Sequence, residues 1–422
     1  MILFYFLIFI MPLMQHPIWG RMAGGMTVFK YIGAACVLYA LFHVAARRSL
    51  PPLFRNRAAL LFLLLYGLAL MSGLTRGAPT SFEANPLSSY TSFLFLFLVT
   101  FSVVDSLSRL HRVLLVAVGS LAFASLYVLR EWQKYHSLYP GFRPGWVVGD
   151  ANYFTVSAVL CLPIAFYLAL EARSRWERAF CLGSLVLTLA AVMLAASRGG
   201  FLGLVAAFLL LTWRSRARLR HLGLAGLLLL PLALAVPNSP LTRLIRPGYG
   251  DREATEKRQL FWTAGLRMVR QHPLGGVGLG NFKFVVSRYA GPDGGPEGIA
   301  HSSYIEIAAE MGLPALLVFL ALLYWTYRTL ERERRLTLRS GPRLAHQAAV
   351  GMQAGLVGYA VSILFVSGQY QKLFWLLAFL SMLLPLLRIS QERQSSLAVV
   401  PGAPGSDLEE LQRLAEPAAR WG

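Results

Sequence analysis

Charged residues are scarce in this chain of 422 residues, and acidic ones are the scarcest, with 20 Asp and Glu against 40 Lys and Arg. Only 14% of the residues are charged, whereas 56% are hydrophobic. Soluble domains carry about 25% charged and roughly 45–50% apolar residues. The composition therefore excludes most classes of soluble protein, and it also excludes a disordered chain.

Cysteine is rare as well. The three cysteines, Cys36, Cys161 and Cys181, lie in apolar stretches and show no CxxC spacing. This pattern suggests neither a disulfide framework nor a zinc site. The first residues, MILFYFLIFIMPLMQ, lack the basic region and the small-residue cleavage site of a signal peptide, so we expect a retained first helix.

The formal net charge is nevertheless +20. A nucleic-acid-binding protein would carry such charge on a soluble domain, but here the basic residues occupy short gaps between apolar runs. We therefore expect an all-α polytopic membrane protein that contacts membrane lipids, and no nucleic acid as a partner.

Apolar segments that could form membrane helices recur along the chain. A helix of about 20 residues crosses the hydrocarbon core, which is about 30 Å thick. About twelve segments approach or meet this length, near residues 1–14, 26–45, 58–74, 87–104, 111–130, 151–170, 179–196, 199–213, 221–236, 303–327, 345–367 and 372–388.

The gaps between these segments alternate in basic content, which predicts their orientation. Cytoplasmic loops collect Lys and Arg. The basic gaps read ARRSLPPLFRNR, SLSRLHR, EARSRWER, WRSRARLRH and RTLERERRLTLRSGPR. We assign them to the cytoplasm together with both termini. We also expect a transmembrane domain over residues 1–390 and a flexible cytoplasmic tail over 391–422.

One long segment, residues 237–302, falls on the opposite face and still carries more basic than acidic residues. Within it, DREATEKRQLFWTAGLRMVRQHPLGG predicts a short amphipathic helix. Helical spacing places Arg258, Trp262, Leu266 and Val269 on one face. An arginine on the buried side of such a helix needs an anion or a carboxylate as its partner.

Arg198, in the turn MLAASRGGFLGL, lies at the boundary of two apolar runs on the same face. A snorkelling arginine in a glycine turn is one interpretation. A phosphate ligand is the other, because the guanidinium fork fits phosphate oxygens.

His301 precedes a helix that re-enters the membrane in AHSSYIEIAAEMGLPALL. The positive end of that helix would favour the neutral, proton-accepting imidazole, although a polar surface histidine is the alternative. Ser303 and Glu306 stand at capping-box spacing. Glu310 lies one turn further into the apolar part and needs a partner such as one of the arginines.

Asp150 and Asn152, in GDANYFTV, open another helix on this face. An N-cap accounts for Asp150, and a contact to a sugar hydroxyl or to the acceptor is the functional alternative. The run GGVGLGN lacks the spacing of a nucleotide-binding loop, so we interpret it as a flexible turn.

Together, DANYF, SRGG, KRQLFW with HPLGGVGLGNF, and HSSYIEIAAEMGLPALL resemble the O-antigen ligase and O-antigen polymerase superfamily over roughly residues 145–330. The resemblance implies a membrane glycosyltransferase of the GT-C type in the bacterial inner membrane. It would take a glycan from undecaprenyl diphosphate at the periplasmic face. Ligases pass the glycan to the lipid A core of lipopolysaccharide, polymerases pass it to another repeat unit of a polysaccharide, and a third branch passes it to protein.

The resemblance also implies site residues. The family histidine falls on His301, with Ile305 in place of the usual leucine, and the family's periplasmic arginines fall on Arg198 and Arg258. Arg243 and Arg288 are further candidates for binding the donor diphosphate, and the loop 237–302 would be catalytic.

In the implied reaction, arginines stabilise the leaving diphosphate. The histidine accepts the proton of the attacking hydroxyl, and the anomeric carbon is inverted. We expect no cofactor and no metal, because the carboxylates are scattered singly. Supporting roles are expected for Glu306, Glu310, Asp150, Asn152 and Trp262. A non-enzymatic transporter of lipid-linked glycans is the alternative class, and it would place ionisable residues at mid-membrane.

Overall fold

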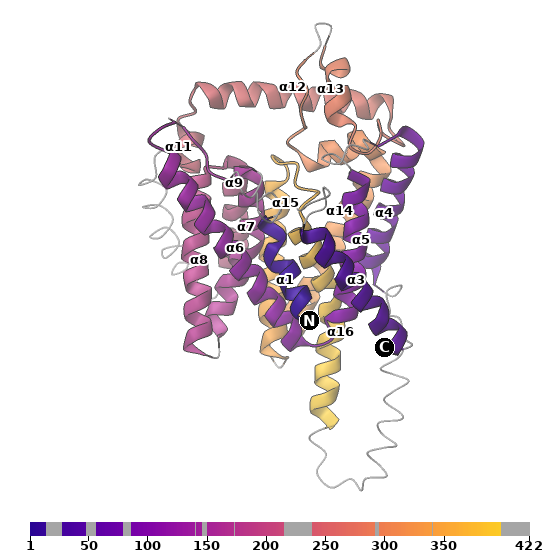
Figure 1. The fold of residues 1–422 in the computed structure, drawn as a ribbon, viewed down its shortest axis with the longest axis vertical. Helices are drawn as coiled ribbons and strands as arrows, with labels where there is room; N and C mark the ends of the chain where they lie inside the picture. Colours follow the sequence, from indigo (N-terminus) through magenta and orange to yellow (C-terminus); the bar gives the residue numbers. More distant parts are fainter. Residues whose placement is uncertain are drawn as a thin grey trace.

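The computed structural model describes residues 1–13, 28–47, 56–78, 86–139, 141–145, 150–172, 174–214, 239–291, 295–339 and 341–397 (Figure 1). These residues form helices and no strands, which confirms the all-α polytopic membrane fold. The elements are α1 (Ile2–Ile10), the 3-10 helix η1 (Met11–Leu13), α3 (Val28–Arg47), α4 (Arg57–Arg76), α5 (Pro86–Val103), α6 (Leu107–Tyr135), α7 (Ala151–Glu171), α8 (Arg175–Ala195), α9 (Arg198–Arg214), α11 (Pro240–Ile245), α12 (Tyr249–Gln271), α13 (Phe282–Ala290), α14 (Ser303–Thr337), α15 (Arg343–Ser362) and α16 (Lys372–Leu397).

The expected membrane segments coincide with helices wherever the structure describes them, and the segment 221–236 lies outside the described residues. Within the described part, seven helices are long and apolar enough to cross a membrane, namely α4, α5, α6, α7, α8, α14 and α16. The apolar segments Ile2–Leu13 and Lys30–His43 are shorter. Helix α16 extends to Leu397, into the expected tail, and residues 398–422 lie outside the described part.

Helix α15 coincides with an expected segment, yet its composition does not make it a membrane-crossing candidate. It packs against α7, α9 and α14, and polar side chains such as Gln347 and Gln353 are buried along it. A helix surrounded by other helices does not face lipid, so its side chains need not be apolar. The central position of α15 thus explains its lower hydropathy.

Glycines on α15 let it approach its neighbours closely. A Cβ added at Gly355 would lie 2.4 Å from the Leu160 carbonyl oxygen of α7. At Gly351 it would lie 2.9 Å from the Ile164 Cα. Small residues at such crossings allow membrane helices to pack backbone against backbone. The α7–α15 contact therefore fixes the relative position of the two helices.

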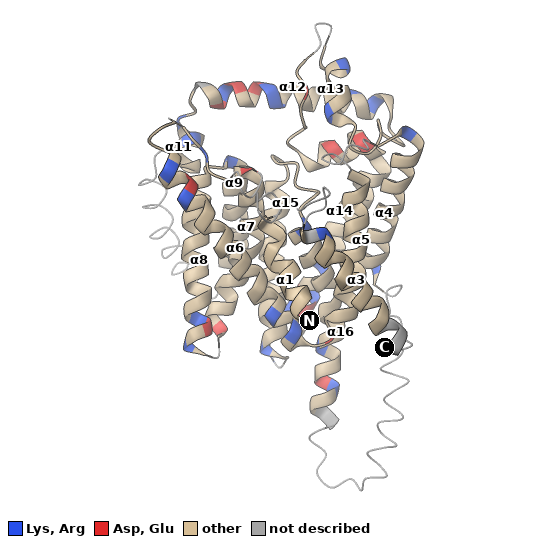
Figure 2. Ribbon diagram, in the orientation of Figure 1, with Lys and Arg blue, Asp and Glu red and all other residues tan. Residues whose placement is uncertain are grey.

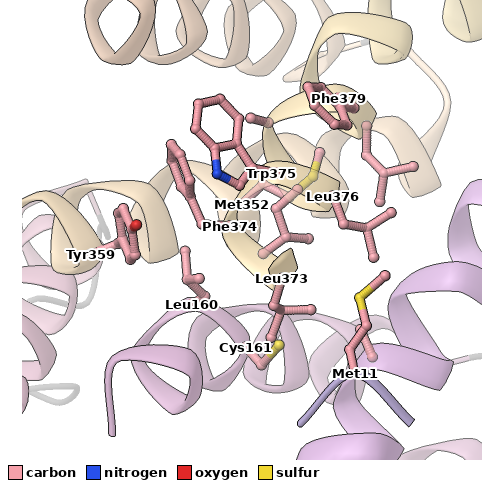
Figure 3. Packing of buried hydrophobic residues seen from close by; sticks show 14 of the residues in the cluster. Met11, Leu160, Cys161, Met352, Tyr359, Leu373, Phe374, Trp375, Leu376 and Phe379 are labelled. Atoms are coloured by element: carbon pink, nitrogen blue, oxygen red, sulfur yellow. The ribbon is translucent and has the colours of Figure 1, made fainter. Parts of the chain in front are cut away.

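Aromatic rings of α16 form a second packed region beside this contact (Figure 3). Trp375 is fully buried and stacks on Phe93 of α5, with ring centroids 5.3 Å apart. Phe374 stacks on Tyr359 of α15 at 4.3 Å. The Tyr359 hydroxyl donates to the Gly368 carbonyl at 2.8 Å, so the same rings hold the connection between α15 and α16.

Helix α12 lies across one end of the bundle, as Figure 1 shows, and we call this the α12 end. It confirms the expected amphipathic helix, because its own side chains Phe261, Ala264 and Met268 are buried on one face. Leu266 was expected on the same face but is 54% exposed, so that assignment was wrong. The inner face of α12 contains Asp251, Arg258 and Phe261. On a helix with that inner face, Leu266 points outward.

Basic residues gather at the opposite end of the bundle (Figure 2). There the Arg214 and Arg334 guanidinium groups each lie 2.9 Å from a Glu331 carboxylate oxygen. Arg388 of α16 lies 2.6 Å from Glu333 of α14. These ion pairs join the ends of α9, α14 and α16.

The close approach of α15 to α7 gives a first prediction. Gly355→Ala should force the two helices apart and cost about 1–3 kcal/mol, because the new methyl group overlaps backbone atoms. The matched control is Gly183→Ala in α8, where nothing lies within 4 Å of the added Cβ. Thermal unfolding in detergent should show a lower midpoint for Gly355→Ala only. Equal midpoints for the two variants would contradict this packing.

Candidate functional site

Three helices that run through the bundle begin beneath α12. Asp150 caps the first turn of α7, Arg198 is the first residue of α9, and His301 lies two residues before α14. A helix N-terminus carries partial positive charge from its unpaired N–H groups. The α12 end therefore has a positive backbone potential before any side chain is added.

Asp251 of α12 binds two of the predicted arginines. Its carboxylate accepts a hydrogen bond from Arg243 and lies 3.8 Å from the Arg198 guanidinium. Arg243 also donates to the Ala196 carbonyl at 2.6 Å. Burial alone would raise the pKa of Asp251, but the hydrogen bond from Arg243 and the two positive charges outweigh it and lower that pKa. Asp251 is therefore ionised and connects α9, α11 and α12.

Arg258 lies on the same helix, half-buried near the Asp251 ion pairs. Its pKa is lowered, first by burial and then by the charges of Arg198 and Arg243. Arginine stays protonated in proteins despite such shifts. Among the described residues, the Arg258 guanidinium makes no hydrogen bond and no ion pair, so its N–H groups are available to an anion.

A further arginine, Arg143, joins the group and was missed from the sequence. Its Nε donates to the Ala195 carbonyl at 3.1 Å, and Nη2 donates to the Asn152 side-chain oxygen at 2.9 Å. Burial lowers its pKa to about 10, and the charges of Arg243 and Arg258 act in the same direction. One signal could have identified it, because Arg143 stands shortly before DANYF in a gap that we expect on the extracytoplasmic face, where the positive-inside rule disfavours arginine.

Asn152 connects Arg143 to the SRGG turn. Its side-chain oxygen also accepts a hydrogen bond from the Ser197 hydroxyl at 2.8 Å. Asp150 accepts from the Asn152 backbone N–H at 2.6 Å, which confirms the expected N-cap. A Cβ at Gly200 would lie 2.1 Å from the Thr155 methyl carbon, so the turn needs glycine where α9 meets α7. The sugar contact suggested for this pair stays a prediction.

His301 adopts a left-handed backbone conformation with φ of 50°. Its pKa is lowered to about 4, chiefly by burial and further by the charge of Arg258, while Asp150 opposes the shift. The expectation of a neutral imidazole thus agrees with the structure, although burial and Arg258 replace the helix end as the cause. Within the described residues neither ring nitrogen makes a hydrogen bond, so one can accept a proton.

Trp262 of α12 holds the backbone next to His301. Its indole Nε1 donates to the Ala300 carbonyl at 2.8 Å, and its ring lies 6.4 Å from that of Phe365. The structure therefore places this residue, expected in a supporting role, directly against the candidate histidine segment.

Glu306 does not form the expected capping box. The N-cap of α14 is Ser302, and Ser303 instead donates to the Val366 carbonyl at 3.1 Å. The Glu306 carboxylate accepts hydrogen bonds from Ser367 and Gln369, the latter at 2.7 Å. Tertiary donors from the α15–α16 connection thus replace the local cap.

Glu310 was expected to pair with an arginine, and this was wrong. Its carboxylate accepts from the Phe282 backbone N–H at 3.3 Å and from the Tyr370 hydroxyl at 3.4 Å. Nearby, the Val277 N–H donates to the Ala309 carbonyl at 2.8 Å, which makes GGVGLGN a structural turn against α14. Both glutamates of α14 thus bind the connection between α15 and α16, and Glu310 also binds the start of α13.

Arg288 lies on the exposed side of α13, and its charge does not contribute to the pKa shifts of Arg143, Arg258 or His301. The structure therefore does not bring this candidate to the others.

In the described part of the chain, no group of three or more His, Cys, Asp or Glu side chains is placed to hold a metal ion. Independence from metals remains a prediction.

The geometry defines a class: a multi-pass membrane protein with a cluster of arginines and a histidine of lowered pKa beneath a helix that lies across one end of the bundle. Residues 183–320 match the family model described as O-Antigen ligase. Over these residues the match confirms the resemblance to the O-antigen ligase and polymerase superfamily that the motifs indicated. This region includes Arg198, Arg243, Arg258 and His301, whereas Arg143 precedes it. A comparison with curated proteins gives no match.

Trp262→Phe tests how the histidine segment is held. Losing the hydrogen bond to the Ala300 carbonyl should cost about 1 kcal/mol and let the backbone around His301 open more often. Hydrogen exchange of the amides in residues 299–302 should become several-fold faster. Trp176→Phe, at a side chain that is 74% exposed, is the control and should leave this exchange unchanged. Unaltered exchange in Trp262→Phe would show that Trp262 does not hold the segment.

The charge of Arg258 lowers the pKa of His301, and a titration of the imidazole can measure this effect. In Arg258→Gln the pKa of His301 should rise from about 4 toward its ordinary value of 6.5, as measured by NMR of labelled histidine. Arg288→Gln is the control and should have no effect. Because the folded pKa is depressed, the unfolded chain binds the proton more readily, and His301 makes the fold less stable as pH falls from 6.5 to about 4. A wild-type pKa near 6.5 would contradict the described environment.

Proposed function

We propose that this protein is an O-antigen ligase that transfers a glycan from undecaprenyl diphosphate to a hydroxyl group of the lipid A core. The family match supports glycosyltransferase-like activity of the ligase and polymerase type. The observation that carries the proposal is the placement of a neutral His301 beside Arg258, within the arginine cluster under α12. Such a site offers a proton acceptor next to cations that suit a phosphate leaving group.

The arginines would act on the leaving group. As the bond between the anomeric carbon and the phosphate oxygen breaks, its electron pair passes to the diphosphate. Preorganised cations stabilise charge that develops in the transition state and cost no reorganisation during the reaction. Arg258 has free N–H groups, and Arg198 and Arg243 hold their charges close to it.

His301 would act on the acceptor. The acceptor hydroxyl oxygen bonds to the anomeric carbon from the side opposite the diphosphate, and its proton passes to the imidazole. A single displacement of this kind inverts the configuration. A pKa near 4 makes the free imidazole a weak base, but bound diphosphate would offset the charge of Arg258 and raise that pKa. Donor binding would thus prepare the base for the acceptor.

The orientation belongs to the same proposal. We assign the α12 end to the periplasm and the opposite end, with the ion-paired arginines of α9, α14 and α16, to the cytoplasm. The inner membrane would hold residues 1–390, with 237–302 forming the periplasmic catalytic segment and both termini in the cytoplasm. The lipid carrier then reaches the arginines from the outer leaflet.

His301→Gln tests the proposed base. The variant should accumulate in the membrane at the wild-type level and lose transfer by a factor of at least about 100, since general-base catalysis contributes roughly 100-fold to 10,000-fold. Loss of glycan-capped lipopolysaccharide on gels is the measurement. His136→Gln, at an exposed histidine at the end of α6, is the control. A wild-type ladder from His301→Gln would refute the assigned role.

The acceptor separates the ligase from a repeat-unit polymerase, which would use the same residues. A deletion strain should accumulate full-length polymer that is not attached to the core if the protein is a ligase. Accumulation of single-repeat carrier or single-repeat core species would instead identify a polymerase. Transfer of lipid-linked glycan across the membrane that survives His301→Gln would identify a transporter.

A further inference from the structure

We infer that Arg143, outside the region matched by the family, is a further binding residue for the donor and contacts its diphosphate. The inference rests on the proposed function and extends it to a segment that neither the motifs nor the match includes. Arg143 stands in the described stretch 141–145, between α6 and α7, and it is half-buried among the other arginines.

The hydrogen bonds of Arg143 fix its guanidinium without cancelling its charge. Both acceptors, the Ala195 carbonyl and the Asn152 side-chain oxygen, are neutral. A guanidinium carries five N–H groups. Two of them are used, and those on Nη1 have no acceptor among the described residues. Arg198 and Arg243 differ in this respect, because both of them share the Asp251 carboxylate.

The charges around the site support this role. The charges of Arg243 and Arg258 act on Arg143, and the carboxylates that act on Arg143 and on Arg258 are Asp150 and Asp251. With Arg198 and Arg243, four positive charges face these two negative ones. A sugar diphosphate of a lipid carries one negative charge on each of its two phosphates, which matches the excess. Without Arg143 the excess would be one positive charge, which matches only one of the two phosphates of this diester.

Preference for two phosphates over one is therefore the property that Arg143 would confer. A purely structural role, in which Arg143 only joins the end of α8 to α7, would weaken the binding of any phosphate ligand to a similar degree. The ratio of diphosphate to monophosphate affinity distinguishes the two roles. Arg143→Lys keeps the charge but loses the planar fork that binds Ala195 and Asn152 together.

The test measures binding of farnesyl diphosphate and farnesyl monophosphate to the full-length protein in phosphatidylcholine nanodiscs. Arg143→Gln should weaken diphosphate binding by about tenfold and monophosphate binding by less than about twofold, as expected for one charge-assisted contact. Arg143→Lys should lie between Arg143→Gln and the wild type. Arg288→Gln, at the exposed arginine of α13, is the matched control and should bind both ligands like the wild type.

The outcomes separate this inference from the proposed function. If Arg143→Gln keeps wild-type diphosphate affinity while Arg258→Gln loses it, the role of Arg143 is refuted and the donor site stands. If Arg143→Gln weakens both ligands equally, its role is structural and the inference also fails. If the wild type does not prefer the diphosphate and Arg258→Gln changes nothing, the proposed donor site itself is wrong. Should Arg143→Gln fail to fold, an unchanged affinity ratio in Arg143→Lys would refute the inference.

Discussion

The ion pairs of Asp251 hold the candidate site together, because they join segments that are distant in sequence. Arg198 begins a helix of the bundle, Arg243 lies in the short helix α11, and Asp251 belongs to α12. A carboxylate with a lowered pKa stays ionised at neutral pH, so Asp251 keeps the charge that attracts both arginines. These ion pairs hold α12 over the ends of α7, α9 and α14. They thereby also position Arg258, whose charge acts on His301, and Trp262, which binds the backbone next to it.

The candidate histidine lies between two supports. From α12, the Trp262 indole holds the Ala300 carbonyl, while the connection between α15 and α16 donates hydrogen bonds to the buried Glu306. The aromatic rings around Trp375 fix that connection in turn, because its indole donates to the Gln369 carbonyl at 2.9 Å. Packing in the membrane part thus helps to fix where the imidazole lies, and burial together with the charge of Arg258 keeps it neutral.

Much of this arrangement could be predicted from the sequence, because periodicity and charge are local signals. Helical spacing revealed α12 and the inward position of Arg258, and the placement of basic residues against the topological rule pointed to Arg198. The partners of Glu306 and Glu310 could not be predicted, since their donors come from segments with no sequence relation to α14. Arg143 was missed although its position breaks the positive-inside rule, because only the fold shows that it contacts Asn152.

The central claim is that the arginines under α12 bind the diphosphate of a lipid-linked glycan beside His301. A structure of the protein in lipid nanodiscs with a bound prenyl diphosphate tests this claim most directly. The account predicts phosphate oxygens within hydrogen-bond distance of Arg258 and Arg143, with the anomeric position on the His301 side. Diphosphate bound elsewhere, with Arg258 and His301 both free of contact, would contradict the account.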